Sequence, residues 1–286
     1  MRSSRTTLAL TGALLLLLVA APAAFGGIFT FDEQGSQNGK DISFLYNITL
    51  IIGLVIFLVV EGAIIYCLVK YRARRGGPDA EQIRGNTPLE IGWTVGAAVI
   101  LVGLTVLTFL YLGDITDPPA SSANGYQAAE GVQFATRDQP KPPGNGALEI
   151  DVNGQQYMWR FDYPGSLKGE AERLYSFYEM VVPTNTTVTL NITASDVIHS
   201  WWIPTLGGKA DATPGYTNET WFKIEKPGIY KGQCAELCGE NHADMLARVR
   251  AVPPDEFRAW AAKQGADIKA AQVGLGLQRL QGVGSE

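Results

Sequence analysis

Long apolar runs fill the first part of the chain, whereas short alternating runs fill the rest. The first apolar run, Leu8 to Ala20, follows two arginines and precedes the small residues of positions 21–24. With 13 residues, it falls short of the roughly 20 that cross a bilayer as a helix. A charged start, a short apolar core and Ala-x-Ala spacing favour a cleaved secretory signal peptide at residues 1–24 over a short membrane anchor.

Two further apolar runs are long enough to span a membrane. They cover residues 44–69 and 89–112, and they predict a transmembrane helical hairpin within residues 40–112. The loop between them, residues 70–88, holds five Lys and Arg against two acidic residues. Loops rich in Lys and Arg stay on the cytoplasmic side. The chain after Leu112 therefore lies outside, as an export signal also requires.

Two acidic residues interrupt the apolar pattern of the hairpin. Glu61 lies within the first span, and Glu90 lies at the cytoplasmic start of the second. A charge within a span indicates a functional role by default. The alternative is that each carboxylate lies near enough to the membrane surface to reach water.

The outside part of the chain has the pattern of a β-protein. Residues 113–147 are rich in Pro, Gly, Ala and Ser, which indicates a linker or a long surface loop. Beyond them, apolar and polar residues alternate in short runs separated by turn residues, which predicts an all-β sandwich or small barrel over residues 148–252. The clearest runs cover residues 148–152, 187–193, 221–224, 229–232 and 246–252. Pro254, followed by two acids, predicts a helix start, so residues 253–286 form a C-terminal helix and tail.

The outside part carries a net negative charge. From Gly113 onward it holds 21 Asp and Glu against 15 Lys and Arg. Because a nucleic-acid partner needs a basic face, no such partner is expected. An acidic surface fits the docking of a basic protein, although a solvated acidic face is the commoner reason for such a balance.

Four metal-binding side chains lie within twelve residues of one segment. They are Cys234, Cys238, His242 and Met245. Thiolate, imidazole and thioether ligands together suit copper better than zinc or magnesium. The chain has 2 His, and the other one, His199, follows the predicted strand at residues 187–193. One ligand from a strand region and the others from a late loop are what a copper site in a β-sandwich requires.

Several other chemistries remain open at this point. Cys234 and Cys238 could form a local disulfide in an oxidising compartment, but this leaves both His and Met245 without a role. A mononuclear blue-copper site needs one Cys, two His and an axial Met, so the second Cys would be spare. Zinc fits by count, although Met is a poor zinc ligand. A copper chaperone also uses a Cys-x-x-x-Cys pair, but on a thioredoxin-like fold.

The whole string resembles the dinuclear copper (CuA) signature of the cytochrome c oxidase subunit II family. The resemblance rests on Gly-Gln-Cys-Ala-Glu-Leu-Cys-Gly-x-x-His-x-x-Met at residues 232–245 and on Asp-Val-Ile-His-Ser-Trp at residues 196–201. The segment at residues 204–215 is also similar to that family, so the resemblance covers roughly residues 40–262. It implies a two-helix transmembrane hairpin followed by an all-β cupredoxin-like Greek-key sandwich.

The resemblance also implies a role for each ligand. Cys234 and Cys238 would bridge two copper ions, and His199 and His242 would each bind one of them. Met245 would be a weak ligand to one copper, and the main-chain carbonyl of Glu236 to the other. The Glu236 carboxylate would help to bind Mg²⁺ (or Mn²⁺) at the interface with the catalytic subunit.

Two further expectations follow from the same resemblance, one for a proton pathway and one for electron entry. Glu90 corresponds to a glutamate at the entrance of a proton pathway into the catalytic subunit. The family reads Gln-Trp-x-Trp after its first strand, where this chain has Gln156-Tyr157-Met158-Trp159. Tyr157 therefore replaces the residue through which electrons are expected to enter, and Trp159 is the second candidate. The electron donor is then cytochrome c or another small donor protein.

The resemblance implies an electron-entry subunit of a haem–copper oxidase in the plasma membrane, with lipid around its spans and its copper domain outside. Its partners would be the catalytic subunit, with haem and a further copper (CuB), and the other oxidase subunits, which reduce O₂ to water and translocate protons. This chain alone would not reduce oxygen, because it has no further His for haem. The alternatives are a nitric-oxide reductase subunit with the same centre and a membrane-tethered copper-binding or delivery protein.

Overall fold

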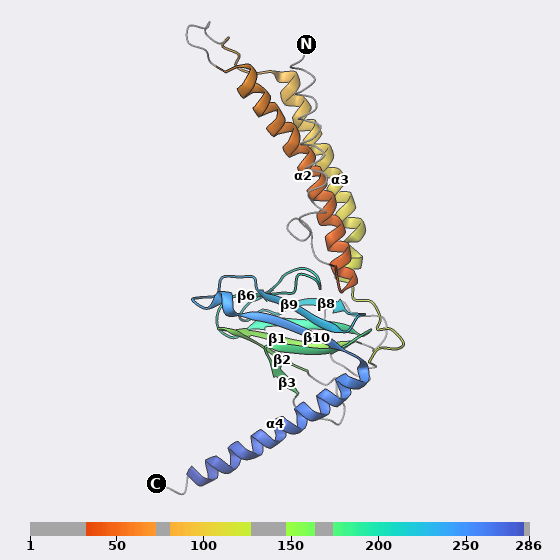
Figure 1. Ribbon diagram of the computed structural model, residues 1–286, viewed down its shortest axis with the longest axis vertical. Helices are drawn as coiled ribbons and strands as arrows, with labels where there is room; N and C mark the ends of the chain where they lie inside the picture. The colour runs from red at the N-terminus through yellow and green to blue at the C-terminus, as the bar shows by residue number, and fades with distance from the viewer. Residues whose placement is uncertain (1–32, 73–80, 127–146, 164–173, 283–286) are drawn as a thin grey trace, which may run out of the picture. The chain divides into compact units, whose positions relative to one another are not determined.

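A computed structural model describes residues 33–72, 81–126, 147–163 and 174–282 (Figure 1). The predicted signal peptide lies outside the described residues, as does part of the basic loop. The chain forms two compact units. Residues 43–113 make up one unit, and the other contains the residues that precede and follow it.

Two long apolar helices form the first of these units. Helix α2 spans Gln37–Lys70 and helix α3 spans Thr87–Thr116, with mean hydropathies of 2.8 and 2.4. Both are long enough to cross a membrane, and the central windows of both expose apolar side chains on every side. The rings of Phe44 and Tyr111 lie 5.1 Å apart, so the outer end of one helix contacts that of the other. Helices that are apolar all round need lipid as their surroundings.

The second unit is a sandwich of two five-stranded sheets (Figure 1). The first sheet has the order β3-β2-β1-β5-β8, and the second has the order β4-β10-β9-β6-β7. Strand β1 runs parallel to β5, and β10 runs parallel to β4. The strands are β1 Leu148–Gln155, β2 Met158–Asp162, β3 Tyr175–Phe177, β4 Glu179–Pro183, β5 Thr187–Ala194, β6 His199–Trp202, β7 Ala210–Ala212, β8 Asn218–Lys223, β9 Gly228–Cys234 and β10 Leu246–Val252.

Alternating apolar residues of both sheets fill the space between them. Leu148, Ile150 and Val152 of β1 are fully buried, and so are the apolar residues Val188, Leu190 and Ile192 of β5 and several residues of the opposite sheet. Side chains two positions apart point to the same face of a strand. The apolar residues of the alternating sequence runs are therefore the ones that form the core. The predicted fold class, a transmembrane helical hairpin plus an all-β cupredoxin-like sandwich, is confirmed.

The described parts of the segments predicted as linker and tail are more ordered than their composition indicates. The chain after α3 follows the start of β5, where the Thr187 hydroxyl donates to the Pro119 carbonyl at 2.6 Å and the Ser122 N–H donates to the Asn185 carbonyl at 2.9 Å. The C-terminal helix, α4 Pro254–Gly282, is longer than a helix start alone predicts. It covers one end of the sandwich by packing Phe257 and Trp260 against Tyr163.

Candidate metal centre

Three neighbouring strands of one sheet supply or flank the predicted copper ligands. His199 is the first residue of β6, Cys234 is the last of β9, and Met245 directly precedes β10. The register pairs Trp201 of β6 with Cys234 of β9. Between Cys234 and Met245 the chain forms a loop and the single 3₁₀ turn η1, His242–Asp244.

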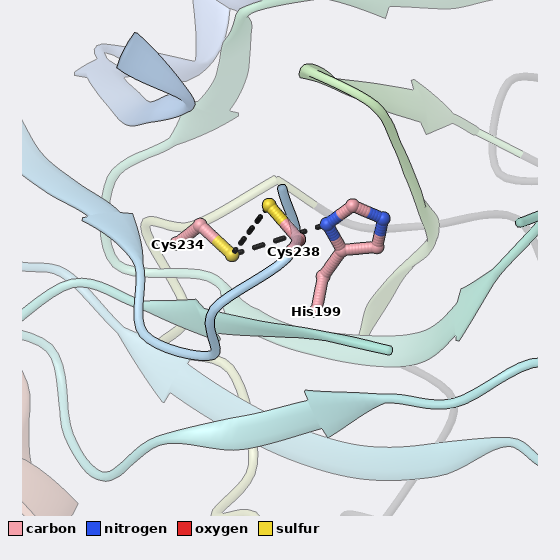
Figure 2. Close-up of side chains that lie close together, drawn as sticks. All are labelled: His199, Cys234 and Cys238. Atoms are coloured by element: carbon pink, nitrogen blue, oxygen red, sulfur yellow. Dashed lines mark hydrogen bonds between the residues drawn. The ribbon is translucent and has the colours of Figure 1, made fainter. Parts of the chain in front are cut away.

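His199, Cys234 and Cys238 converge in the interior of the domain (Figure 2). Their Nδ1 and Sγ atoms all lie within 4.8 Å of one another. The two Sγ atoms are 4.0 Å apart, and His199 Nδ1 lies 3.9 Å from Cys234 Sγ. Both cysteines are free thiols. The spacing leaves room for metal between the sulfurs and does not describe a disulfide, whose S–S bond is about 2 Å.

The remaining predicted ligands surround the same pair of thiols. His242 Nδ1 lies 3.6 Å from Cys238 Sγ, and Met245 Sδ lies 3.8 Å from the same atom. The main-chain carbonyl of Glu236 lies 3.2 Å from Cys234 Sγ. The structure therefore brings together two thiolates, two imidazoles, one thioether and one carbonyl. This donor set fits copper by its softness, and it has one imidazole beside each sulfur.

Burial controls the electrostatics of the centre. His199 and Met245 are fully buried, and Cys234 and Cys238 are 2% and 4% exposed. Burial, together with the neighbouring Cys234, raises the pKa of Cys238 to about 11. Two adjacent buried thiolates are thus unfavourable by themselves, because each charge lacks water and repels the other. Bound cations would supply the missing positive charge, since metal coordination deprotonates a thiol.

Asp196 holds the ring of His199 from outside the cluster. Its Oδ1 lies 2.9 Å from His199 Nε2, and its Oδ2 accepts the Gln156 N–H at 2.7 Å. Partial burial alone would raise the pKa of the Asp196 carboxyl, but the hydrogen bonds from Gln156, His199 and the Val197 N–H lower it. With Nε2 bonded to a carboxylate, Nδ1 is left to face the thiols. Metal-binding His residues commonly have such a partner.

Aromatic side chains border the site. Trp159 is fully buried and meets the His199 ring edge-on, with the ring centroids 6.0 Å apart. Trp201 stacks on Phe222 in the core. Tyr157 is half-buried and lies against Gly239, since a Cβ atom built on that glycine would be 2.5 Å from the Tyr157 hydroxyl. Of the two residues considered for electron entry, only Tyr157 reaches the surface.

The two predicted acidic residues, Glu236 and Glu90, have carboxylates that do not take part in the thiol cluster. The Glu236 side chain is exposed, although its carbonyl faces Cys234. Glu90 is exposed in the first turn of α3, where its carboxylate accepts the Asn86 N–H at 3.0 Å. The sequence reasoning did not assign roles to Asp196 or Gln156. The available signal was the place of Asp196 in the segment at residues 196–201 and of Gln156 beside Tyr157, in the segment compared with the family's Gln-Trp-x-Trp.

Comparisons with known proteins agree with this geometry. The family model "Cytochrome C oxidase subunit II, transmembrane domain" matches residues 20–110, and "Cytochrome C oxidase subunit II, periplasmic domain" matches residues 165–252. "Cytochrome c oxidase subunit 2" of Alkalihalophilus pseudofirmus is 32% identical over 259 residues, which cover 87% of this chain and 68% of that protein. The protein of the same name from Thermostichus vulcanus is 34% identical, with 84% and 80% covered.

A solved structure is also similar. The periplasmic domain of subunit II of the cytochrome oxidase of Bradyrhizobium japonicum is 35% identical, with a TM-score of 0.40, and the match covers 44% of this chain and 97% of that one. Both family models match in their expected order, and the relatives align over most of their length. The chain, with its membrane hairpin and its buried cluster of thiols and imidazoles, belongs to the cytochrome c oxidase subunit II family.

Proposed function

We propose that this chain is the electron-entry subunit of a respiratory haem–copper oxidase and that it holds a dinuclear copper centre. The observation that carries the proposal is the convergence of six donor groups, two of which are free, buried thiols. Cys234 and Cys238 would be the ligands shared by both metal ions. His199, His242, Met245 and the Glu236 carbonyl would complete the set.

The protein residues make this site suited to one-electron transfer. When bound, copper held by the two thiolates and the surrounding ligands would supply a redox centre that takes up and releases one electron at a time. His199 and Cys234 lie on paired strands of a packed sandwich, so their positions change little with the charge of the site. Met245 and Trp159 exclude water from it. A rigid, dry shell keeps the reorganisation energy low, and hydrogen bonds around the ligands tune the potential.

The surface above the cysteine loop is the proposed entry point for electrons. Tyr157 lies against Gly239, one residue after Cys238, and it is half-buried, so it reaches the surface beside the loop backbone. The acidic balance of the outside part favours a basic donor, cytochrome c or another small protein. The acceptor is haem in the catalytic subunit, which also holds CuB and, with the other subunits, reduces O₂ to water while translocating protons.

Two acidic residues have proposed roles at the interface with the catalytic subunit. The exposed Glu236 carboxylate is free to point away from the copper cluster, which supports a shared Mg²⁺ (or Mn²⁺) site. Glu90, at the proposed cytoplasmic start of α3, has an exposed side chain, which supports a role at the entrance of a proton pathway. In the proposed domain organisation, residues 1–24 are a cleaved signal peptide and residues 40–112 form the membrane hairpin. Residues 113–147 connect the hairpin to the copper domain, which comprises residues 148–252 and lies on the outer side of the plasma membrane. Residues 253–286 form a C-terminal helix and tail.

Copper loading of the full chain in detergent tests the proposal. We expect two copper ions per chain and the purple, mixed-valence spectrum of a dinuclear centre. One copper per chain, a colourless Cu(I) protein or a zinc protein would refute it and favour a copper-delivery role. Co-purification identifies the catalytic partner, since haem with oxygen uptake indicates an oxidase, whereas nitric-oxide turnover indicates the reductase.

A further inference from the structure

The turn between β1 and β2 contacts both segments that supply the copper ligands. Gln156 lies in this turn and makes two long-range hydrogen bonds. Its main-chain N–H donates to Asp196 Oδ2 at 2.7 Å, across 40 positions of sequence. Its side-chain Nε2 donates to the carbonyl oxygen of Cys238 at 2.6 Å, across 82 positions. The same residue is therefore tied to the segment before His199 and to the cysteine loop.

These bonds form a continuous path between two ligands. His199 faces the thiols with Nδ1, and its Nε2 lies 2.9 Å from Asp196 Oδ1. Asp196 accepts the Gln156 N–H, and the Gln156 side chain reaches the carbonyl of Cys238. The path runs from His199 to Cys238 without passing through a metal ion. The two ligands belong to different segments, the start of β6 and the loop after β9, so the path sets their relative position.

The cysteine loop approaches this turn too closely for a side chain. Gly239 has a φ of +135°, which L-residues rarely adopt. A Cβ atom there would lie 2.9 Å from Gln156 Nε2 and 2.5 Å from the Tyr157 hydroxyl. The residue after Cys238 thus lets the loop backbone lie directly on Gln156 and Tyr157. The hydrogen bond to the Cys238 carbonyl is part of a close and specific contact.

We propose that Gln156 is a positioning residue for the copper centre, which it serves by joining the His199 segment to the Cys238 carbonyl. The inference rests on the proposed function, because it assigns a role toward the metal. The side-chain amide donates the only N–H that reaches this carbonyl among the described hydrogen bonds. Its loss frees the main chain at Cys238 and lets the bridging Sγ move relative to His199. Residues that orient metal ligands typically change metal affinity 10- to 100-fold when replaced.

Two substitutions at this position separate the hydrogen bond from the bulk of the side chain. Gln156→Ala removes both, whereas Gln156→Glu keeps the shape and loses the N–H donor. In the copper-loaded full chain in detergent, we expect both variants to release copper to a Cu(I) chelator about 10-fold more readily. We also expect shifted visible bands and a changed reduction potential. Because the Gln156 side chain is exposed, both variants should fold.

Gln264→Ala is the matched control. Gln264 Nε2 donates to the Tyr175 carbonyl at 3.0 Å, so the control removes the same kind of bond from helix α4. It should leave spectrum, potential and copper affinity unchanged. Wild-type values of all three in both Gln156 variants would overturn the inference while leaving the proposed function intact. A wild-type chain that forms no dinuclear centre would instead overturn the proposed function and the inference together.

Discussion

The Nδ1 atom of His199 lies 3.9 Å from the Sγ atom of Cys234, although the two residues are 35 positions apart in the sequence. Strand pairing explains this approach. Trp201 pairs with Cys234 across β6 and β9, and His199, two residues before Trp201, points to the same face of β6. That face is the interior of the sandwich, so the imidazole and the thiol meet where water is excluded.

Replacing one of the two proposed bridging thiols should abolish the proposed dinuclear centre. Cys238→Ser exchanges a soft sulfur ligand for a hydroxyl, which cannot bridge two copper ions in this set. We expect loss of the purple spectrum and fewer than two copper ions per chain. The control is Cys67→Ser, because Cys67 is exposed on α2, and it should retain both. A native spectrum in Cys238→Ser would exclude Cys238 as a ligand.

Glu236→Gln should separate copper from magnesium. Copper is expected to remain because the main-chain carbonyl beside Cys234 Sγ is unchanged. Mg²⁺ should be weakened, since a neutral amide replaces a carboxylate ligand. Metal analysis of the assembled oxidase measures both ions, and Glu240→Gln, an exposed acid of the same loop, serves as control. Unaltered Mg²⁺ in Glu236→Gln would count against this site.

Gly232→Ala should disturb the strand pair that carries His199 and Cys234. A Cβ atom at Gly232 would lie 1.8 Å from the main-chain oxygen of Trp202, so the two strands would have to separate. Overpacking of this kind costs about 3 kcal/mol, and we expect a lower free energy of unfolding and weaker copper binding.

Gly228→Ala is the matched variant on the same strand. The nearest atom to a Cβ there is 3.8 Å away, on the Tyr230 ring, which is ordinary contact. Thermal unfolding of the two metal-free variants in detergent gives the comparison. Equal melting temperatures would show that strands β6 and β9 can separate at no cost.

Asp151→Asn should stabilise the protein at neutral pH. Burial, supported by the nearby Asp162, raises the pKa of Asp151 against the opposing hydrogen bond from Asn191. A raised pKa in the folded state favours the protonated acid, so the stability that this group contributes is present at acidic pH and is lost as the pH rises through the folded pKa. An uncharged Asn at this position does not ionise, so the protein does not lose this stability as the pH rises.

The expected measurement is Tm as a function of pH. Asp151→Asn should melt at a higher temperature than wild type at pH 7, and the difference should shrink below the ordinary pKa of an aspartate. Glu225→Gln, at an exposed position, should show no comparable gain. A lower Tm for Asp151→Asn at pH 7 would mean that the hydrogen bond from Asn191 to the Asp151 carboxylate outweighs the cost of burying the charge.

Much of the architecture could be predicted from local pattern. The two spans follow from unbroken apolar length, and β1, β5 and β10 from strict alternation, because membrane and core each impose a periodicity on the residues that face them. Strands β3 and β7 have three residues each and are too short to show a period. The ordered conformation of the segment from Pro119 to Ser122 could not be predicted either, because it depends on hydrogen bonds to strand β5, which lies more than 60 residues away in the sequence.

The sequence by itself determined the membrane hairpin, the β-class of the outer domain and the chemistry of the ligand set, because these depend on residue types and their spacing. Only the tertiary structure decided that His199 presents Nδ1 to the thiols, that Tyr157 rather than Trp159 reaches the surface, and that Gln156 connects the two ligand segments. The physical reason is that side-chain orientation and long-range hydrogen bonds arise from the pairing of strands β6 and β9 and from the packing of the β1–β2 turn. These contacts join residues that no local pattern relates.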